Sequence, residues 1–430
     1  MAIACVIVSR QDSQLPAPLD RVLRLSHRWP RSEFFIDGGR VSLSELADLR
    51  GRVRLMVHHA GFGVIDERGE GFVISLQPSK ILGLTELRDS PFCSEIRLSG
   101  ECVVVKSGPV GSPPLAYYRT AELIAASCPP LLLGIEGGEM RVVPPNYNMR
   151  VSFDESRVEG QVIKSFPPSP PPASVSDAAN LIYEELLASV RRSVSRGCAV
   201  LFSGGLDSSV LLSLCLTLGL NPLAISAGLT GSHDLLASKR AAELLGADYL
   251  EVALSEKEIV ESRNYLARNL PLRSKMDEAL AVLIYVSSLR AVLDGRRQVV
   301  SGQGADELFG GYMKYLRLAK SSGVVAAVAE MKKDLSELWV AGLPRDYASA
   351  ALGGALFTVP YLDERIVSNT YNLPPEFRIS GGVRKVVLRE VARVAGLPEE
   401  LVEREKKAAQ YGTGIERVLK RLVAREVRGS

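Results

Sequence analysis

The chain has 430 residues, enough for two or three domains, and 46% hydrophobic with 23% charged residues is the balance of a soluble globular protein. The net charge of +3 comes from interleaved acids and bases, which argues against a nucleic-acid partner. No apolar run reaches membrane-spanning length, and residues 3–8 are too short an apolar stretch for a signal peptide, so we expect a cytoplasmic protein without a membrane partner.

The first part of the chain, residues 1–163, is predicted to be rich in strands. Residues 121–126 are a short helix candidate in this part. Apolar or alternating runs that are typical of strands lie at 53–57, 71–76, 95–98 and 101–105. Five prolines between positions 167 and 172 exclude a helix or a central strand. We therefore predict an extended linker over residues 164–174.

From residue 175 to 430, strands and helices alternate, which is typical of a parallel α/β sheet. The predicted strands are 199–202, 223–227, 249–252 and 298–301, and the predicted helices include 175–196, 234–245 and 276–293. After residue 316 the chain is predicted to be mostly helical. Ligands of such sheets bind outside the carboxyl ends of the strands. The loops at 203–209, 226–232 and 301–307 are therefore expected to line one crevice.

The loop Ser203–Ser209 reads Ser-Gly-Gly-Leu-Asp-Ser-Ser and joins a predicted strand to a predicted helix. Its glycines allow backbone N–H groups to approach an anion, and the helix N-terminus adds a positive dipole end. Asp207 can hold Mg²⁺ against phosphate oxygens. The loop lacks the Gly-Lys-Ser/Thr ending of a Walker A motif. The alternative is a tight turn that binds nothing.

A second motif, residues 301–312, reads Ser-Gly-Gln-Gly-Ala-Asp-Glu-Leu-Phe-Gly-Gly-Tyr and begins where the fourth strand is predicted to end. Asp306 and Glu307 open the next helix, where the dipole favours carboxylates. Taken alone, the motif equally fits a capped helix with an acidic first turn. Beside Asp207, it predicts a second arm of a metal site.

These motifs resemble known families. The first loop is similar to the pyrophosphate loop of N-type ATP pyrophosphatases, and the pair resembles asparagine synthetase, which has Ser-Gly-Glu-Gly-Ser-Asp-Glu-Leu-Phe-Gly-Gly-Tyr at the second motif. The resemblance covers most of residues 175–415. The further segments that are similar to this family are 225–229, 360–363, 373–376, 385–390 and 406–412.

The resemblance implies an α/β architecture. Residues 175–430 would form a Rossmann-like ATP pyrophosphatase domain with a parallel sheet, and residues 1–163 an N-terminal-nucleophile (Ntn) hydrolase-like α+β domain with αββα layers. The implied ligands are ATP and Mg²⁺. The nucleotide-binding residues implied are Leu201, Ala227 and Gly302 for the adenosine side, Ser203, Gly204, Gly205 and Ser208 for pyrophosphate, Asp207 and Asp306 for Mg²⁺, and Ser301 as a further nucleotide-binding residue. Lys385 would stabilise transition-state charge.

The first part of the chain resembles the family's glutaminase domain through Gly108–Gly111, Pro114–Leu115 and Val142–Pro145. Glutaminases of this type use a cysteine exposed by removal of Met1. Here position 2 is Ala2, and Cys5 lies within a predicted strand and would need a further cleavage. We expect this domain to keep its fold but to lack amide hydrolysis, as in divergent asparagine synthetase-like proteins.

Two positions in the second part depart from the family pattern. Gln303 stands where the family has Glu, and an amide cannot take a proton from attacking ammonia. Either Glu307 or a phosphate oxygen does so, or the amine differs, so the expected catalytic residues are Lys385, Gln303 and Glu307. Thr358 stands where the family has Arg. Without that arginine, the identity of the acidic substrate is left undecided.

The sequence thus predicts an ATP-dependent ligase that converts aspartate to asparagine with ammonia through an acyl-AMP, releasing AMP and pyrophosphate. One alternative is a related ligase for another carboxylate or amine, and another is a non-catalytic ATP-binding regulator. The expected partners are small molecules, and the sequence is compatible with a homodimer. Pyrophosphatases that act on tRNA are disfavoured because they lack the 301–312 motif.

Overall fold

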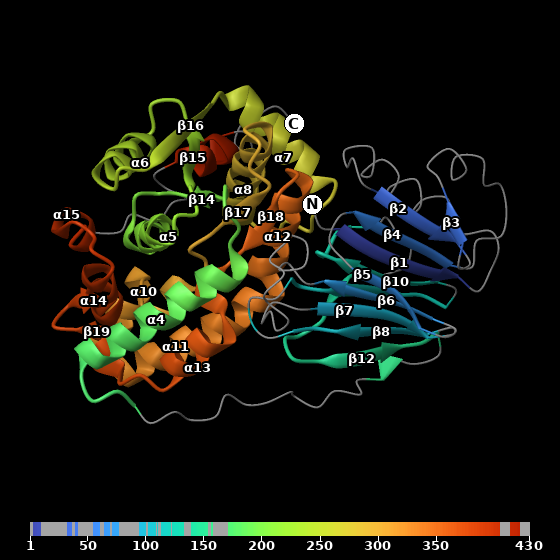
Figure 1. Ribbon diagram of the computed structural model, residues 1–430, viewed down its shortest axis with the longest axis horizontal. Helices are drawn as coiled ribbons and strands as arrows, with labels where there is room; N and C mark the ends of the chain where they lie inside the picture. The colour runs from blue at the N-terminus through green and yellow to red at the C-terminus, as the bar shows by residue number, and fades with distance from the viewer. Residues whose placement is uncertain are drawn as a thin grey trace.

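Figure 1 shows the computed structural model, with a strand-rich N-terminal part beside an α/β part. The structure describes residues 171–404 and 413–421 without interruption. In the earlier chain it describes the strands 3–9, 32–36, 39–41, 55–60, 64–68 and 71–76, and then 94–99, 102–108, 110, 113–121, 123–132, 139–153 and 156–157. None of the helices found in these ranges has the length and apolar character needed to cross a membrane.

The N-terminal part contains two sheets whose described pairings are antiparallel. The seven-stranded sheet has the order β11-β9-β10-β1-β4-β2-β3, with β1 Ile3–Ser9, β2 Ser32–Ile36, β3 Gly39–Val41, β4 Leu55–Ala60, β9 Ala116–Arg119, β10 Leu123–Cys128 and β11 Arg141–Val142. The six-stranded sheet has the order β13-β12-β8-β7-β6-β5, with β5 Val64–Arg68, β6 Gly71–Leu76, β7 Ser94–Ser99, β8 Cys102–Lys106, β12 Asn148–Val151 and β13 Ser156–Arg157. The helical layers expected of an αββα fold lie outside the described residues of this part.

The predicted helix at 121–126 is wrong, because these residues enter strand β10. All six residues of β10 are buried, and the strand pairs on one side with β1 and on the other with β9. Alanine favours a helix in an isolated segment, but its small side chain also fits a strand that is covered on both faces. Tertiary packing therefore overrides the local preference here.

The second part is built on a parallel sheet with the order β16-β15-β14-β17-β18. Its strands are β14 Ala199–Leu201, β15 Leu223–Leu229, β16 Asp248–Leu254, β17 Gln298–Val300 and β18 Leu356–Thr358. The parallel sheet was predicted, and four of its strands lie within a few residues of the predicted ones; β18 was not predicted. The chain order reverses at β14, which lies between β15 and β17, so a crevice opens at this point of the sheet.

Helices cover this sheet on both faces (Figure 1). Their bounds are α4 Val175–Ser193, α5 Leu206–Thr217, α6 His233–Leu244, α7 Glu256–Ala267, α8 Lys275–Leu293, α9 Ala305–Phe309, α10 Met313–Ser322, α11 Val324–Glu337, α12 Leu343–Leu352, α13 Glu364–Tyr371, α14 Val386–Val394 and α15 Glu399–Val402. The second part also contains short elements. They are one turn of π-helix (the π-turn) at Leu338–Gly342, 3₁₀ turns at Pro360–Leu362 and Pro375–Phe377, and the hairpin strands β19 Ile379–Ser380 and β20 Val383–Arg384.

Helix α4 shows how the sequence sets an element. Ser174 accepts a hydrogen bond from the backbone N–H of Asp177 and so caps the first turn. The helix ends at Ser193, three residues before the predicted end, and its apolar stripe packs on α14. Burial of Ile182, Leu186 and Val190 along that stripe stabilises the helix more than its intrinsic propensity does.

The two parts of the chain are in contact through buried groups. Trp339, which is 1% exposed in the π-turn, donates a hydrogen bond from Nε1 to the carbonyl of Val143 at 2.8 Å. The backbone N–H of Leu132 donates to the carbonyl of Asn269 at 2.9 Å. A cavity of about 190 Å³ lies beside these contacts and is lined by residues from both parts.

Candidate functional site

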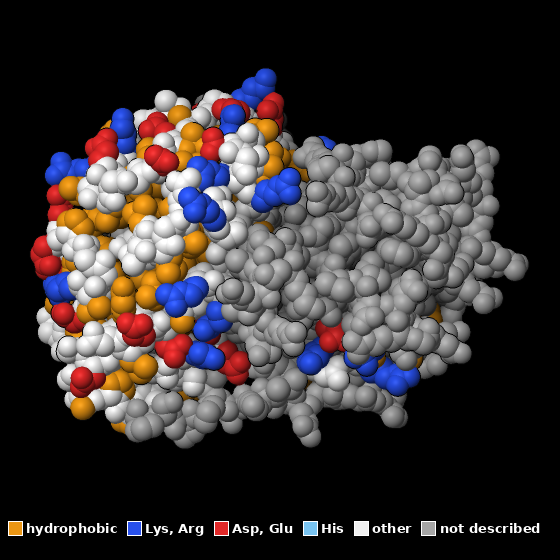
Figure 2. Space-filling model, viewed as in Figure 1, with side chains coloured by type: hydrophobic (Ala, Val, Ile, Leu, Met, Phe, Trp, Pro, Cys, Tyr) orange, Lys and Arg blue, Asp and Glu red, His pale blue; other side chains and the backbone are white. Residues whose placement is uncertain are grey.

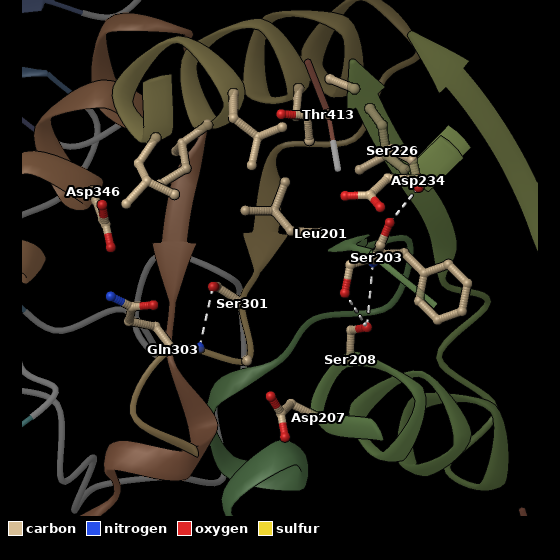
Figure 3. A pocket seen from close by; sticks show the side chains of 18 of the residues that line it. Leu201, Ser203, Asp207, Ser208, Ser226, Asp234, Ser301, Gln303, Asp346 and Thr413 are labelled. Carbon is tan, nitrogen blue, oxygen red and sulfur yellow. Dashed lines mark hydrogen bonds between the residues drawn. The ribbon is translucent and has the colours of Figure 1, made fainter. Parts of the chain in front are cut away.

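A pocket of about 220 Å³ lies at the carboxyl ends of β14, β15 and β17, where the crevice was predicted (Figure 3). The predicted site residues that line it are Leu201, Ser203, Asp207, Ser208, Ala227, Ser301, Gly302, Gln303, Asp306 and Glu307. Gly204, Gly205 and Lys385 are not among its lining residues. The two glycines follow Ser203 in the same loop. Lys385 contacts Asp207 and Asp306, which do line the pocket.

The loop after β14 is organised by its own serines. The N–H of Ser203 donates to Oγ of Ser208 at 3.3 Å, and the N–H of Gly205 donates to Oγ of Ser203 at 3.3 Å. Figure 3 shows the Ser203 and Ser208 side chains next to each other at the start of α5. Gly205 is the N-cap of α5 and has no side chain that could cap the helix, so the positive end of the helix dipole faces the loop without a side-chain cap.

Lys385 lies between the two aspartates that the sequence assigned to a metal. Its Nζ makes an ion pair with Asp306 Oδ1 at 2.7 Å and a shorter one with Asp207 Oδ1. Lys385 is 5% exposed and occupies the left-handed region at φ 59° and ψ 39°, as the N-cap of α14. A non-glycine residue held in this conformation is strained, and such strain is found at functional sites.

The carboxylates beside Lys385 are the candidate ligands for the expected Mg²⁺. Among the residues that the structure describes, no cluster of three or more His, Cys, Asp or Glu side chains could hold a metal alone. Asp207 and Asp306 nevertheless both contact the same lysine, beside the loop Ser203–Ser209. Mg²⁺ in nucleotide sites is held by one or two carboxylates together with phosphate oxygens. These residues therefore fit an ion that enters with the nucleotide.

Two glycines of the second motif are required by close packing. A Cβ added to Gly311 would overlap Oδ1 of Asp306 and Cε of Lys385. Gly304 has a φ of +91°, and a Cβ there would overlap the side chain of Leu362. Gly311, directly before Tyr312, therefore leaves the volume that the lysine and its carboxylate occupy.

Two tyrosines that the sequence reasoning did not assign to the site hydrogen-bond to its acidic residues; Tyr312 lines the pocket, whereas Tyr361 does not. Tyr361 donates its hydroxyl to the carbonyl of Asp207 at 3.0 Å, and Tyr312 donates to Oε1 of Glu307 at 2.7 Å. Burial, together with the neighbouring carboxylates, raises the pKa of both hydroxyls well above the ordinary value. Both therefore stay protonated donors. Their motifs, Pro-Tyr-Leu-Asp and Gly-Gly-Tyr, were the signal that could have identified them.

The other end of the pocket carries an ionic cluster. Arg345 pairs with Asp277 at 2.6 Å and with Asp346 at 2.7 Å, and Figure 3 shows Gln303 and Asp346 on the same side of the pocket. Burial is the main cause of the raised pKa of Asp346. Thr358, in contrast, is buried in β18, accepts a hydrogen bond from Gln298 at 2.7 Å and is not a lining residue.

The last part of the chain also reaches the pocket. Residues 406–412, which resembled a family signature, lie outside the described residues. Thr413 lines the pocket, and its carbonyl accepts a hydrogen bond from the N–H of Leu229 at 2.8 Å. This contact lies at the carboxyl end of β15, next to the predicted adenosine side.

Comparison with known proteins identifies the family of this chain. The sequence model of the asparagine synthase family matches residues 181–355 and 343–429, which together span more than half of the chain. The chain belongs to the asparagine synthase family. This confirms the resemblance and the mixed α/β architecture built on a parallel sheet.

Individual relatives agree with this assignment. The chain is 29% identical to a putative glutamine-hydrolysing asparagine synthetase 1 of Methanocaldococcus jannaschii over 67% of this chain and 61% of the relative. It is 32% identical to the human glutamine-hydrolysing asparagine synthetase over 50% of this chain and 39% of that protein. The chain therefore matches less than two thirds of the length of these relatives. An NMN synthetase structure from Francisella tularensis, 12% identical, covers 57% of this chain and 86% of its own, but its TM-score of 0.31 supports no conclusion.

Proposed function

We propose that this protein is an ATP-dependent amide ligase that converts aspartate to asparagine, with free ammonia as the nitrogen donor. The observation that carries the proposal is the placement of Lys385 between Asp207 and Asp306 beside the loop Ser203–Ser209. The lysine and the helix N-terminus match the negative charge that develops when pyrophosphate leaves a nucleotide, and the two carboxylates could hold a cation that would do the same.

In the proposed reaction, a carboxylate oxygen of aspartate attacks the α-phosphorus of ATP, and the bond to the β-phosphate oxygen breaks. Pyrophosphate leaves toward the N-terminus of α5. Asp207 and Asp306 would hold Mg²⁺, which would supply positive charge against the phosphate oxygens. Ammonia then attacks the acyl-AMP carbonyl, a proton passes to Glu307 or to a phosphate oxygen, and AMP leaves. Lys385 stabilises the charge in both steps.

We propose ammonia rather than glutamine as the nitrogen donor. Cys5 lies in the middle of β1, with Ser127 and His58 as its neighbours on β10 and β4. A terminal cysteine nucleophile must instead offer its own amine at the end of the chain. With this placement, Cys5 is unsuited to hydrolyse glutamine.

The proposed ligands are all small: Mg²⁺–ATP, aspartate and ammonia. On the face shown in Figure 2, Lys and Arg side chains alternate with Asp and Glu over the described α/β surface. A mixed surface of this kind supports our proposal that nucleic acid is not a substrate. A homodimer in the cytoplasm remains part of the proposal.

The test has two steps. Exchange of labelled pyrophosphate into ATP, in the presence of aspartate and Mg²⁺, reports the first half-reaction without any amine. Release of AMP and asparagine on addition of ammonium chloride reports the second half-reaction, and glutamine in place of ammonium chloride should give neither product.

Lys385→Met should lower exchange at least a hundredfold, roughly the loss of one preorganised charge contact. Lys275→Met, which breaks a remote ion pair with Glu278, should not lower exchange. No exchange by the wild type with aspartate contradicts the aspartate proposal.

A second candidate keeps the chemistry but changes the substrates. Gln303 and the Arg345–Asp346 pair form one end of the pocket, and an amide there cannot act as a base for ammonia. A different carboxylate, or an amine other than ammonia, would explain this end of the pocket. The exchange assay repeated with a panel of carboxylates distinguishes this candidate. ATP binding without exchange for any carboxylate would instead indicate a regulatory protein.

A further inference from the structure

Arg404, just after α15, reaches the loop that is proposed to hold pyrophosphate. Its Nη1 donates a hydrogen bond to the carbonyl of Gly204 at 2.9 Å and to the carbonyl of Ala237, in α6, at 3.3 Å. The guanidinium thus connects the phosphate loop, which follows β14, with the helix that follows β15. This contact joins residues 200 positions apart, so no local motif indicated it.

The loop is shaped to receive this arginine. Gly204 has a φ of +64°, and a Cβ there would lie 2.9 Å from Nη1 of Arg404 and 3.0 Å from both the carbonyl oxygen of Ala237 and Cβ of Ala241. Such distances leave no room for a side chain. The glycine at this position is therefore required both by its backbone conformation and by the closeness of Arg404 and α6.

The hydrogen bond to Gly204 also fixes the direction of the next N–H group. In a trans peptide the C=O and the following N–H point in opposite directions. With the carbonyl of Gly204 directed at Arg404, the N–H of Gly205 points away from it, toward Oγ of Ser203, which lines the pocket. The same peptide leads directly into the first turn of α5. Holding this carbonyl therefore keeps the loop in its anion-accepting orientation.

Arg404 and Arg240 both act on Glu400, but in different ways. Glu400 is hydrogen-bonded to Arg240 at 2.9 Å, which is the main cause of its lowered pKa, and Arg404 contributes to that lowering from farther away. Arg240 thus joins α15 to α6 by an exposed ion pair, while Arg404 joins the same segment to the loop. The two arginines differ in that only Arg404 contacts the loop.

We propose that Arg404 is a positioning residue for the pyrophosphate group. It orients the Gly204–Gly205 peptide and in this way raises the affinity of the loop for pyrophosphate. The proposal rests on the proposed function, because it assigns pyrophosphate to this loop. It concerns the pyrophosphate end of the pocket and leaves the adenosine side, formed by β14, β15 and Thr413, unchanged.

The test is a pair of binding measurements by isothermal titration calorimetry on the full chain, with Mg²⁺–pyrophosphate and with AMP as probes. Arg404→Ala should raise the Kd for pyrophosphate at least about tenfold, the scale of a hydrogen bond to a charged donor, and leave the Kd for AMP within twofold. Arg404→Lys, which retains one charged donor, should recover part of the loss. Arg240→Ala removes the other contact between α15 and α6 and should change neither value.

Each outcome bears on a different claim. If wild-type protein binds pyrophosphate and Arg404→Ala binds it equally well, Arg404 has no positioning role, while the proposed function stands. Equal losses of pyrophosphate and AMP affinity, or an equal effect of Arg240→Ala, would indicate general loosening and would also overturn the inference. If wild-type protein binds no pyrophosphate, the proposed function itself fails. Should Arg404→Ala not fold, the comparison of Arg404→Lys with wild type decides the case.

Discussion

Gln303 is the residue at which the chemistry of the pocket departs most from a simple amide ligase. It lines the pocket together with Asp346 and Glu307, and its backbone N–H donates a hydrogen bond to Oγ of Ser301 at 3.3 Å. A glutamine offers a donor and an acceptor here but no base. The neighbouring carboxylates mean that an acid introduced at this position would have a raised pKa, closer to the pH at which ligases work.

We predict that Gln303→Glu accelerates the second half-reaction. Asparagine formation at subsaturating ammonium should rise about tenfold or more, because a positioned general base contributes on the order of 10². The rate should increase with pH through the pKa of the new carboxyl group. Pyrophosphate exchange should stay within threefold of wild type. Gln303→Asn, which keeps the amide, serves as the matched control; equal rates for the Glu and Asn variants would contradict the prediction.

At the scale of elements, the sequence predicted the strands that bear the loops, and with them most of the pocket. The apolar runs before Ser203 and Ser301 and the glycines after them are local signals, so they could be found by inspection. Strand β18 was missed although it is no shorter than β14 and β17, because no glycine-rich loop follows it to mark its end. The contacts of Tyr361 with Asp207 and of Lys385 with both aspartates join distant segments, and no spacing rule predicts them.

Gly311, between α9 and α10, lets us test whether these elements must pack this closely. We predict that Gly311→Ala lowers pyrophosphate exchange at least tenfold, because the new methyl group displaces Asp306 and Lys385 from each other. The cost to stability should be about 1–3 kcal/mol of overpacking. Gly246→Ala is the control: its φ of +63° makes it strained by roughly 1 kcal/mol, but nothing lies within 4 Å, so exchange should persist. Loss of exchange in both variants would show that instability alone explains the effect.

For the molecule as a whole, the question is whether its two parts fold as one unit. Trp339 is a fully buried side chain whose indole N–H bonds to the carbonyl of Val143 in the N-terminal part. It lies in the same π-turn as Gly342, where an added Cβ would lie 3.6 Å from Nε2 of Gln303. The contact between the parts is therefore one short turn away from the pocket.

We predict that Trp339→Phe lowers the free energy of unfolding by about 1–3 kcal/mol, since the carbonyl of Val143 loses its buried donor. Trp339→Ala should lower it by about 3–5 kcal/mol, because a large cavity is added to the lost hydrogen bond. If the parts are coupled through this residue, denaturation followed by circular dichroism should change from one transition in wild type to two in Trp339→Ala, with the less stable part unfolding first. A single transition of unchanged midpoint in both variants would mean that the parts are held together by other contacts, such as the backbone bond from Leu132 to Asn269.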